Sequence, residues 1–308
     1  MNSFSIIVGI KNISLSQEEK GYLKKFKPLG VILFKRNILD KKQVTLLIQE
    51  IKSILGAASL IMIDQEGGRV SRLSKKLWPE FPPASFFGKI AKSEPEKAKK
   101  VTFENFYLIG KELNKLGINY NCAPVLDLLI KNSDQVIGNR SFSRDPKIIG
   151  VLGYEACKGL IKAKVNPILK HIPGHGRAKV DSHKSLPKIN LNTTQLKDDF
   201  YPFKKLNRFN YAMTAHIKYS KIDNKNCVTQ SKIVIKNIIR NLIGFKGVLF
   251  SDDLCMKALK GSYYYRAKKS IEAGCDIVLH CEPNLEYIIK STLGAGKTSD
   301  ELKKKLFK

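Results

Sequence analysis

The sequence lacks any apolar run approaching the roughly 18 to 20 residues that a membrane-spanning helix requires. Its first twenty residues, MNSFSIIVGIKNISLSQEEK, contain no basic stretch ahead of an apolar segment and no small-residue cleavage site after one. We therefore expect no signal peptide. Both absences favour a cytoplasmic protein without a membrane partner.

Paired cysteine motifs are missing as well. The six cysteines form no C-x-x-C and are scattered through segments with the composition of a core. This pattern favours reduced thiols over disulfides or a zinc site, so we expect neither a metal nor another cofactor. The six are Cys122, Cys157, Cys227, Cys255, Cys275 and Cys281.

Acidic residues are scarce. The chain has 27 Asp and Glu against 55 Lys and Arg, a net charge of +28. Clustered basic residues would indicate a nucleic-acid binder. Here the lysines are spread over nearly every polar helical face, and no nucleic-acid module is recognisable. We interpret the charge as a solvated surface with a mild preference for anionic ligands, and we expect no specific nucleic-acid partner.

The 308 residues contain no linker, repeat or low-complexity segment, and 43% of them are hydrophobic. We therefore expect one domain over residues 1–308, with Ser299–Lys308 as a solvated helix or fraying end. Eight short apolar runs alternate with amphipathic helical patterns, which predicts an α/β fold, a single (β/α)8 TIM barrel. The expected strands are Phe4–Ile10, Gly30–Phe34, Leu60–Asp64, Tyr120–Leu128, Pro167–Ile172, Tyr211–His216, Val248–Asp252 and Asp276–His280. The expected helices are Ser16–Phe26, Asp40–Leu55, Glu94–Leu116, Pro146–Lys164, Thr194–Arg208, Ser231–Ile243 and Lys257–Ala273.

Polar groups able to do chemistry stand at the ends of these strands. In a TIM barrel the carboxyl ends of the strands form the active-site face. The sequence therefore predicts one functional site built from residues far apart in the chain. The strand-end groups are Asp64, Asp127, Lys170, His171, His216, Asp252 and His280.

One run is richer than the others. Three of the five histidines fall in Lys170–His183, beside Lys170, Asp181 and two glycines. Asp181, two residues before His183, can fix the tautomer of that histidine and prepare it for proton transfer. Taken alone, the three histidines are also compatible with a metal site.

The other motifs are weaker one by one. Asp64 could accept hydrogen bonds from ligand hydroxyls, or could simply pair with Arg69. Arg140 could clamp a ligand with its planar fork of donors, although loop arginines are commonly solvated. Of the adjacent carboxylates, Asp252 is the candidate nucleophile and Asp253 the candidate helix cap; both could be caps.

The order of these motifs resembles the single-domain β-N-acetylglucosaminidases of glycoside hydrolase family 3, along almost the whole chain. The combined K-H-x-P-G-H-G…D-S-H and S-D-D-L-x-M patterns are highly specific. The matching segments are Gly30–Phe34, Asp64–Val70 with Arg72, Asn121–Asp127, Ile137–Phe142, Lys170–Gly176 with Asp181–His183, and Ser251–Met256. The departures are minor: Ile172 replaces a common aromatic, and Arg177–Lys179 fill a variable part of the loop.

The resemblance implies a retaining hydrolase that releases N-acetylglucosamine (GlcNAc) from GlcNAc-anhydroMurNAc muropeptides in peptidoglycan recycling. The substrate is thus a small carbohydrate. Asp252 would be the nucleophile, and His183 the acid/base with Asp181 hydrogen-bonded to it, in a loop, Gly174–Pro187, that closes over the sugar. His175 would support that loop, and Met213 or His216 would line the pocket. The resemblance implies sugar contacts from Asp64, Arg72, Arg140, Lys170 and His171.

Other functions fit the same motifs. A phosphorylase would deliver phosphate to the same intermediate, and another family 3 β-glycosidase would take a different sugar. A catalytically silent binding protein fits less well, because candidates for both nucleophile and acid/base are present. A nucleic-acid binder stays the most distant alternative.

Overall fold

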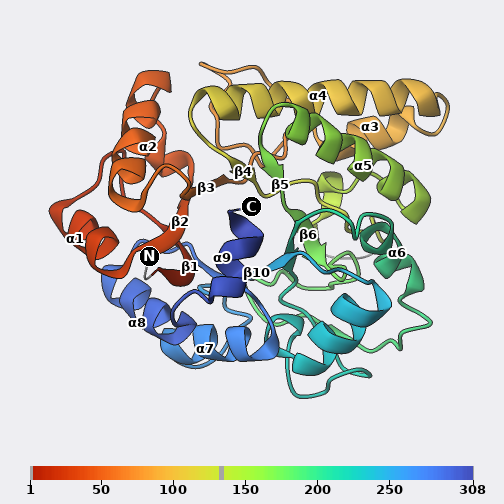
Figure 1. Ribbon diagram of the computed structural model, residues 1–308. Helices are drawn as coiled ribbons and strands as arrows, with labels where there is room; N and C mark the ends of the chain where they lie inside the picture. The colour runs from red at the N-terminus through yellow and green to blue at the C-terminus, as the bar shows by residue number, and fades with distance from the viewer. Residues whose placement is uncertain (1–2, 132–134, 308) are drawn as a thin grey trace.

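The computed structural model describes residues 3–131 and 135–307. In that part of the chain nine parallel strands form one sheet in the order β5-β4-β3-β2-β1-β11-β10-β8-β6, with helices around it (Figure 1). The two outermost strands, β5 and β6, are separated only by Ile168, so the chain itself joins the ends of the sheet. The predicted (β/α)8 barrel is confirmed, with the fifth expected strand split in two.

The sheet strands are β1 (Phe4–Gly9), β2 (Pro28–Leu33), β3 (Leu60–Ile63), β4 (Tyr120–Asn121), β5 (Asn166–Pro167), β6 (Leu169–Ile172), β8 (Tyr211–Thr214), β10 (Val248–Asp253) and β11 (Ile277–His280). A separate two-stranded sheet pairs β7 (Lys188–Ile189) with β9 (Lys218–Tyr219). The α-helices are α1 (Gln17–Phe26), α2 (Lys41–Leu55), α3 (Ala84–Ile90), α4 (Pro95–Lys115), α5 (Pro146–Lys162), α6 (Lys197–Lys205), α7 (Tyr263–Ala273), α8 (Leu285–Ala295) and α9 (Asp300–Leu306). Short 3₁₀ helices are η1 (Lys35–Asn37), η2 (Gly138–Arg140) and η3 (Val228–Gln230), and η4 (Val234–Leu242) is a π-helix.

The strands read as continuous apolar runs because both of their faces are buried. In β3, Leu60 and Met62 belong to the cluster inside the barrel, while Ile61 and Ile63 belong to the larger cluster between strands and helices. Side chains of a strand alternate between its faces, so this period of two decides which residue at the strand end points into the barrel.

Local signals set several helix boundaries. Ser16 caps α1 and forms the expected capping box with Glu19. The helix expected from Lys257 begins only at Tyr263, because Gly261 has φ +89° and Ser262 provides the N-cap.

The expected strand Tyr120–Leu128 is mostly wrong. Pairing in β4 ends at Asn121, and Pro124 has no N–H to donate to a ladder. The chain nevertheless continues beside β6, because the Leu126 N–H donates to the Lys170 carbonyl. Asp127 is therefore delivered to the barrel mouth by an irregular segment.

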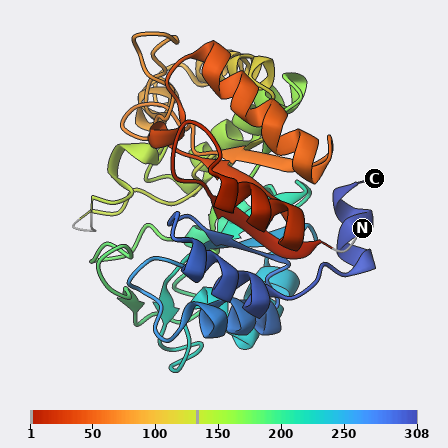
Figure 2. The same ribbon diagram turned by 90° about the vertical axis from the view of Figure 1, so that its left-hand side faces the viewer.

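The basic tail is helical but not solvated on all sides. Leu302 and Leu306 of α9 are buried in the cluster inside the barrel, at its amino-terminal end. The Thr298 N–H donates to the Ser3 carbonyl, so the two ends of the chain meet there (Figure 2). The expectation of a solvated tail is wrong for these residues, because one face of α9 is apolar; Lys308 lies outside the described residues.

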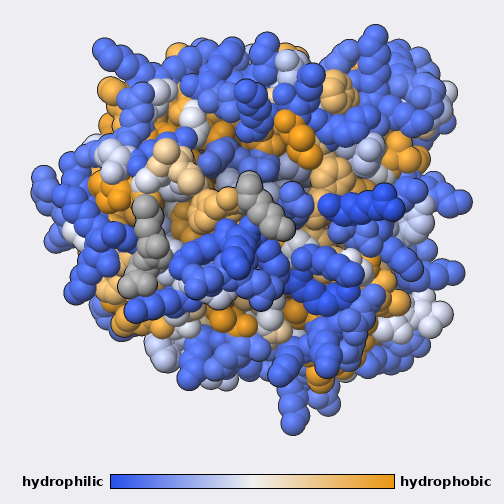
Figure 3. All heavy atoms as spheres, viewed as in Figure 1, coloured by the Kyte–Doolittle hydropathy of each residue, from blue (hydrophilic) through white to orange (hydrophobic). Residues whose placement is uncertain are grey.

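The surface agrees with the composition. Hydrophilic side chains cover most of the face seen in Figure 3, with apolar patches between them. Among the described helices, none has the length and apolar character that crossing a membrane would take.

Candidate active site

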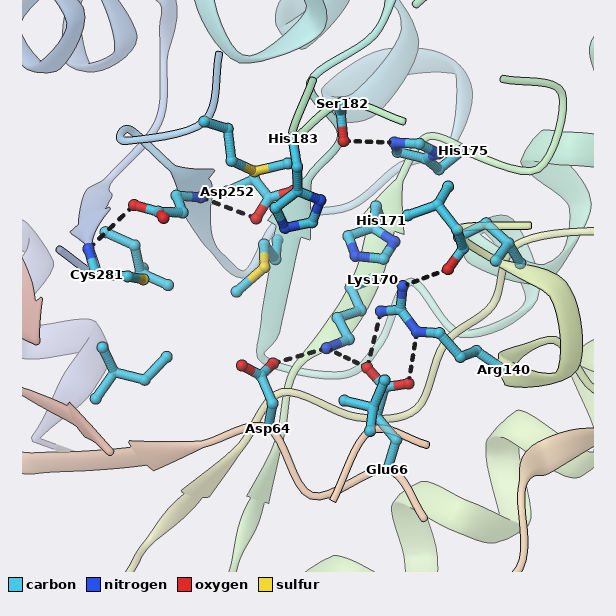
Figure 4. Close-up of a pocket in the computed structure, with 18 of the residues that line it drawn as sticks. Asp64, Glu66, Arg140, Lys170, His171, His175, Ser182, His183, Asp252 and Cys281 are labelled. Carbon is cyan, nitrogen blue, oxygen red and sulfur yellow. Dashed lines mark hydrogen bonds and ion pairs between the residues drawn. The ribbon is translucent and has the colours of Figure 1, made fainter. Parts of the chain in front are cut away.

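A pocket of about 180 Å³ opens at the carboxyl ends of the strands and gathers almost all of the predicted site residues (Figure 4). Strand alternation explains much of this convergence. Asp64 continues the inward positions Leu60 and Met62 of β3, and Asp252 continues Val248 and Phe250 of β10. The predicted residues that line the pocket are Asp64, Arg72, Arg140, Lys170, His171, His183 and Asp252, together with His175 and Met213.

Asp64 forms ion pairs with two cations in the pocket. Its Oδ1 lies 2.8 Å from Lys170 Nζ, and its Oδ2 lies 3.1 Å from Arg72 Nη2. Burial raises the pKa of Asp64, but the charges of Lys170 and Arg72 more than offset this, so the pKa lies below its usual value. Asp64 is therefore an ionised hydrogen-bond acceptor, and the alternative pairing with Arg69 is wrong.

Glu66 is the important residue that the sequence analysis missed. Its Oε1 lies 2.6 Å from Lys170 Nζ, and both of its oxygens bind Arg140, at 2.8 and 2.9 Å. Burial raises the pKa of Glu66, but Arg140 and Lys170 lower it to about 2. The alternation of side chains along a strand could have indicated Glu66, since it follows Asp64 by two residues and so continues the same side of β3.

Arg69 and Arg140 hold the loop before η2. Arg69 Nη2 donates to the backbone carbonyls of Val136 and Ile137, both of which line the pocket, and Arg140 Nη1 also donates to Val136. Arg140 is thus a nearly buried side chain held by protein groups, so the alternative of a solvated loop arginine is wrong.

Asp127 organises the beginning of the histidine-rich run. Its Oδ2 lies 2.7 Å from His171 Nδ1, and its Oδ1 accepts the His175 N–H at 2.6 Å. Burial raises the pKa of Asp127, but His171 lowers it overall. With Nδ1 of His171 occupied by Asp127, its Nε2 is the ring nitrogen left for a ligand.

His175 connects the buried Asp127 to the loop that carries His183. Its Nε2 lies 3.1 Å from Ser182 Oγ, directly before His183. Burial lowers the pKa of His175 to about 4, so the ring is neutral near pH 7. This contact fits the expected support of the loop.

Asp181 and His183 form the predicted pair. Asp181 Oδ1 lies 2.8 Å from His183 Nδ1 and also accepts the His183 backbone N–H. The His183 side chain is 65% exposed, at the open side of the pocket. Nε2 of His183 is therefore available to exchange a proton with a ligand.

The two adjacent carboxylates differ in their surroundings. Asp252 Oδ1 accepts the Asp253 N–H at 2.8 Å, and burial raises the pKa of Asp252, but nearby His216 and His171 lower it overall. Asp253 Oδ1 accepts the backbone N–H groups of Cys255 and Cys281, each at 3.0 Å. Both carboxylates line the pocket, but Asp253 Oδ1 is occupied by these backbone N–H groups, so Asp252 stays the candidate nucleophile.

Two strand-end histidines serve the structure instead of the pocket. His216 binds Thr229 Oγ1 through Nδ1 and the Asp253 carbonyl through Nε2, and it does not line the pocket. His280 binds Ser291 Oγ behind β11. Of the two residues expected to line the pocket, Met213 does so and His216 does not, because both ring nitrogens of His216 are used within the barrel wall.

Cysteine and metal chemistry can be described for residues 3–131 and 135–307. All six cysteines are free thiols. Within those ranges, no three His, Cys, Asp or Glu side chains are close enough together to hold a metal ion.

Comparison with known proteins places this site in a family. The model of the glycosyl hydrolase family 3 N terminal domain matches residues 6–306. The chain belongs to this family. A curated beta-hexosaminidase of Neisseria gonorrhoeae is 38% identical over 282 residues, which cover 90% of this chain and 77% of the relative. A beta-hexosaminidase of Nitrosospira multiformis is 35% identical over 281 residues, covering 90% and 80%.

Solved structures agree with the family assignment. Native NagZ from N. gonorrhoeae superposes with a TM-score of 0.91 at 34% identity, over 99% of this chain and 89% of that one. NagZ from the same organism in complex with N-trifluoroacetyl-D-glucosamine superposes with a TM-score of 0.86 at 32% identity, over 99% and 93%. The predicted family, barrel fold and glycoside hydrolase class are confirmed. The roles of individual side chains remain predictions.

Proposed function

We propose that this family 3 enzyme is a retaining exo-β-N-acetylhexosaminidase that removes terminal GlcNAc from peptidoglycan fragments, GlcNAc-anhydroMurNAc muropeptides among them. The observation that carries the proposal is that Asp252 and His183 line the same pocket as the charged cluster around Asp64 and Lys170. Relatives named beta-hexosaminidase, and a relative's complex with a GlcNAc analogue, support the choice of sugar.

The pocket favours one terminal sugar. Its volume of about 180 Å³ is below the roughly 300 to 1,000 Å³ of sites for drug-sized ligands. Asp64 would accept hydrogen bonds from sugar hydroxyls, while Arg72, Arg140, Lys170 and His171 would donate them. Arg72 Nε is buried and without a partner among the described residues, so it has a donor to offer.

The reaction follows from the two groups that face the sugar. One Asp252 oxygen forms a bond to the anomeric carbon while the glycosidic C–O bond breaks and its electron pair stays on the leaving oxygen. That oxygen takes the proton from His183 Nε2. Water then attacks the anomeric carbon, Nε2 takes a water proton, and the bond to Asp252 breaks. Both groups return to their initial protonation states.

Asp181 and the loop would prepare the acid/base. Asp181 is bound to Nδ1 of His183, so the proton that moves is the one on Nε2. Because His183 is exposed, we propose that the loop Gly174–Pro187 closes over the bound sugar and brings Nε2 to the glycosidic oxygen.

We further propose that residues 1–308 act as one domain in the cytoplasm. Free thiols at all six cysteines are compatible with a reducing compartment. Fractionation of cells producing the tagged protein tests the location: recovery with the soluble cytoplasmic fraction is expected, and recovery outside the cytoplasm contradicts it.

Hydrolysis of an aryl β-GlcNAc by the wild type and by Asp252→Asn tests the proposal. Rapid release of GlcNAc by the wild type is expected, with near-complete loss in Asp252→Asn and no loss in the control Asp300→Asn, an exposed position on α9. The same assay with inorganic phosphate identifies a phosphorylase, because GlcNAc 1-phosphate would then replace free GlcNAc. Undiminished turnover in Asp252→Asn would contradict the nucleophile assignment.

A further inference from the structure

The buried carboxylate of Glu66 lies between two cations of the pocket, and the reaction as described does not use it (Figure 4). We propose that Glu66 is a positioning residue, which holds the Lys170 ammonium and the Arg140 guanidinium so that their remaining N–H groups point at the bound sugar. This inference rests on the proposed glycosidase function and adds a specific role within the same site.

Most of the hydrogen-bonding capacity of Glu66 is already used within the protein. Oε1 accepts from Lys170 Nζ at 2.6 Å and from Arg140 Nη2 at 2.9 Å, while Oε2 accepts from Arg140 Nε at 2.8 Å. Its side chain is only 7% exposed. A carboxylate this enclosed acts through the cations that it binds rather than by direct contact with a sugar.

Counting donors shows what Glu66 leaves free. Lys170 has three N–H groups, of which one goes to Asp64 and one to Glu66. Arg140 has five, of which two go to Glu66 and one to the Val136 carbonyl. Among contacts with described residues, one donor on Lys170 and two on Arg140 remain. Because the other donors are fixed, the directions of these three are fixed as well.

Charge gives Glu66 a second effect on the same two groups. The Lys170 and Arg140 side chains are both nearly buried and close enough for their charges to repel. The pKa of Glu66 is lowered to about 2, so its carboxylate is ionised at neutral pH and offsets that repulsion. The transition state of glycoside transfer carries positive charge on the sugar, which an uncompensated pair of cations would disfavour.

The fold also explains why this task falls to Glu66. Lys170 belongs to β6 and Arg140 to η2, whereas Glu66 follows β3. The Glu66 carboxylate therefore links three segments of the chain through its ion pairs at the mouth of the barrel. Loss of these ion pairs changes the relative placement of the Lys170 and Arg140 side chains without removing either of them.

The test compares Glu66→Gln and Glu66→Asp with the matched control Glu112→Gln. Glu112 also bridges two lysines, Lys41 and Lys115, but on α4 at the surface. For aryl β-GlcNAc hydrolysis, Glu66→Gln should lower kcat/KM about 100-fold, through weaker sugar binding as well as a lower kcat, because the misplaced donors contact the sugar in both the ground state and the transition state. Glu66→Asp, which keeps the charge, should lose less, and Glu112→Gln should stay within about twofold.

A double variant separates positioning from a general structural effect. If Glu66 acts through Arg140, then Glu66→Gln combined with Arg140→Ala should lose clearly less than the product of the two single losses. A strictly multiplicative loss, or a folded Glu66→Gln with wild-type kcat/KM, overturns the proposal. If Glu66→Gln does not fold, a folded Glu66→Asp with unchanged kinetics overturns it equally.

Calorimetric binding of GlcNAc distinguishes failure of this inference from failure of the proposed function. If the wild type binds GlcNAc but cleaves no β-GlcNAc substrate, the result contradicts the proposed function but not the role of Glu66. Weaker GlcNAc binding by Glu66→Gln would then still support positioning, and unchanged binding would remove the role of Glu66.

Discussion

At the residue scale, the site gathers carboxylates in a chain that has few of them. Only 27 of 308 residues are acidic, yet Asp64, Glu66, Asp127 and Asp252 stand together at the barrel mouth, each with a pKa below its usual value. Burial alone would raise every one of these pKa values. Nearby cations, histidines or backbone N–H groups keep the carboxylates ionised, which suits a nucleophile and hydrogen-bond acceptors.

The proposed acid/base role of His183 makes a prediction that depends on the leaving group. His183→Ala should lower kcat/KM for an unactivated GlcNAc disaccharide about 1,000-fold, since the leaving oxygen then receives no proton. The loss should be much smaller for a dinitrophenyl leaving group, which departs as a stable anion. Lys179→Ala, exposed in the same loop, is the control. Equal losses on both substrates would contradict the role.

The pKa of Glu66 predicts how stability depends on pH. A carboxyl group whose pKa falls from 4.5 to about 2 on folding contributes stability above pH 4.5 and loses it as the pH approaches 2. Across that window the wild type should lose about 3 kcal/mol more of its free energy of unfolding than Glu66→Gln. Urea unfolding at several pH values measures this, with Glu104→Gln on the exposed side of α4 as control. Parallel curves for wild type and Glu66→Gln would contradict it.

The residues that the sequence predicted and the one that it missed differ in a physical way. Asp64 and Asp252 end apolar strands, so strand alternation and the barrel rule place them at the active-site face. Glu66 lies in a turn beyond the strand, and its importance comes from Arg140, 74 residues away. Only the closed barrel brings that pair together.

At the element scale, the predictions succeeded where apolar runs were short and clearly bounded. β3 and β10 end within one residue of their predicted limits. β4 did not follow the prediction, because an apolar run through Pro124 looks the same whether it pairs in a ladder or packs irregularly. Helix α3 was not expected at all, and its seven residues are too few for a clear helical period.

The first turn of the loop Gly174–Pro187 depends on a close backbone approach at Gly176. A Cβ added there would lie 2.1 Å from the Leu128 carbonyl oxygen, so the loop that carries His183 would have to shift. Gly176→Ala should therefore cost about 1 to 3 kcal/mol of stability and lower kcat/KM.

Gly21→Ala is the matched control for that substitution. Gly21 lies in α1 with nothing within 4 Å of an added Cβ, so alanine should raise stability by about 0.5 to 1 kcal/mol. Thermal unfolding and initial rates measure both variants. Wild-type activity in Gly176→Ala would show that the loop tolerates the displacement.

At the scale of the whole molecule, the two ends of the barrel differ: one holds the candidate active site, and the other is closed by packed apolar side chains. Polar strand ends build the pocket at one end. Helix α9 lies at the other end, and its apolar residues Leu302 and Leu306 pack into the cluster inside the barrel. The chain ends meet at that second end, through the bond between Thr298 and Ser3. Substitutions at that second end should therefore change stability without changing activity.

Leu302→Ala tests how much the packing of α9 at the amino-terminal end of the barrel contributes to stability. Removing a side chain that is only 5% exposed should cost about 2 to 5 kcal/mol of unfolding free energy, with kcat/KM unchanged at temperatures where the variant is folded. Leu293→Ala on α8, where the leucine is 52% exposed, should change stability by less than about 0.5 kcal/mol. Equal stability of the two variants would contradict the packing of α9 described above.

The central claim is that Asp252 becomes covalently bonded to the anomeric carbon, and trapping the intermediate tests it most directly. A 5-fluorinated GlcNAc fluoride forms such an intermediate readily and releases it slowly, so that proteolysis and mass spectrometry can locate the sugar. The proposed mechanism predicts one added sugar on the peptide that contains Asp252, and none in Asp252→Asn. Turnover with the sugar attached to another residue, or with no covalent adduct at all, would contradict it.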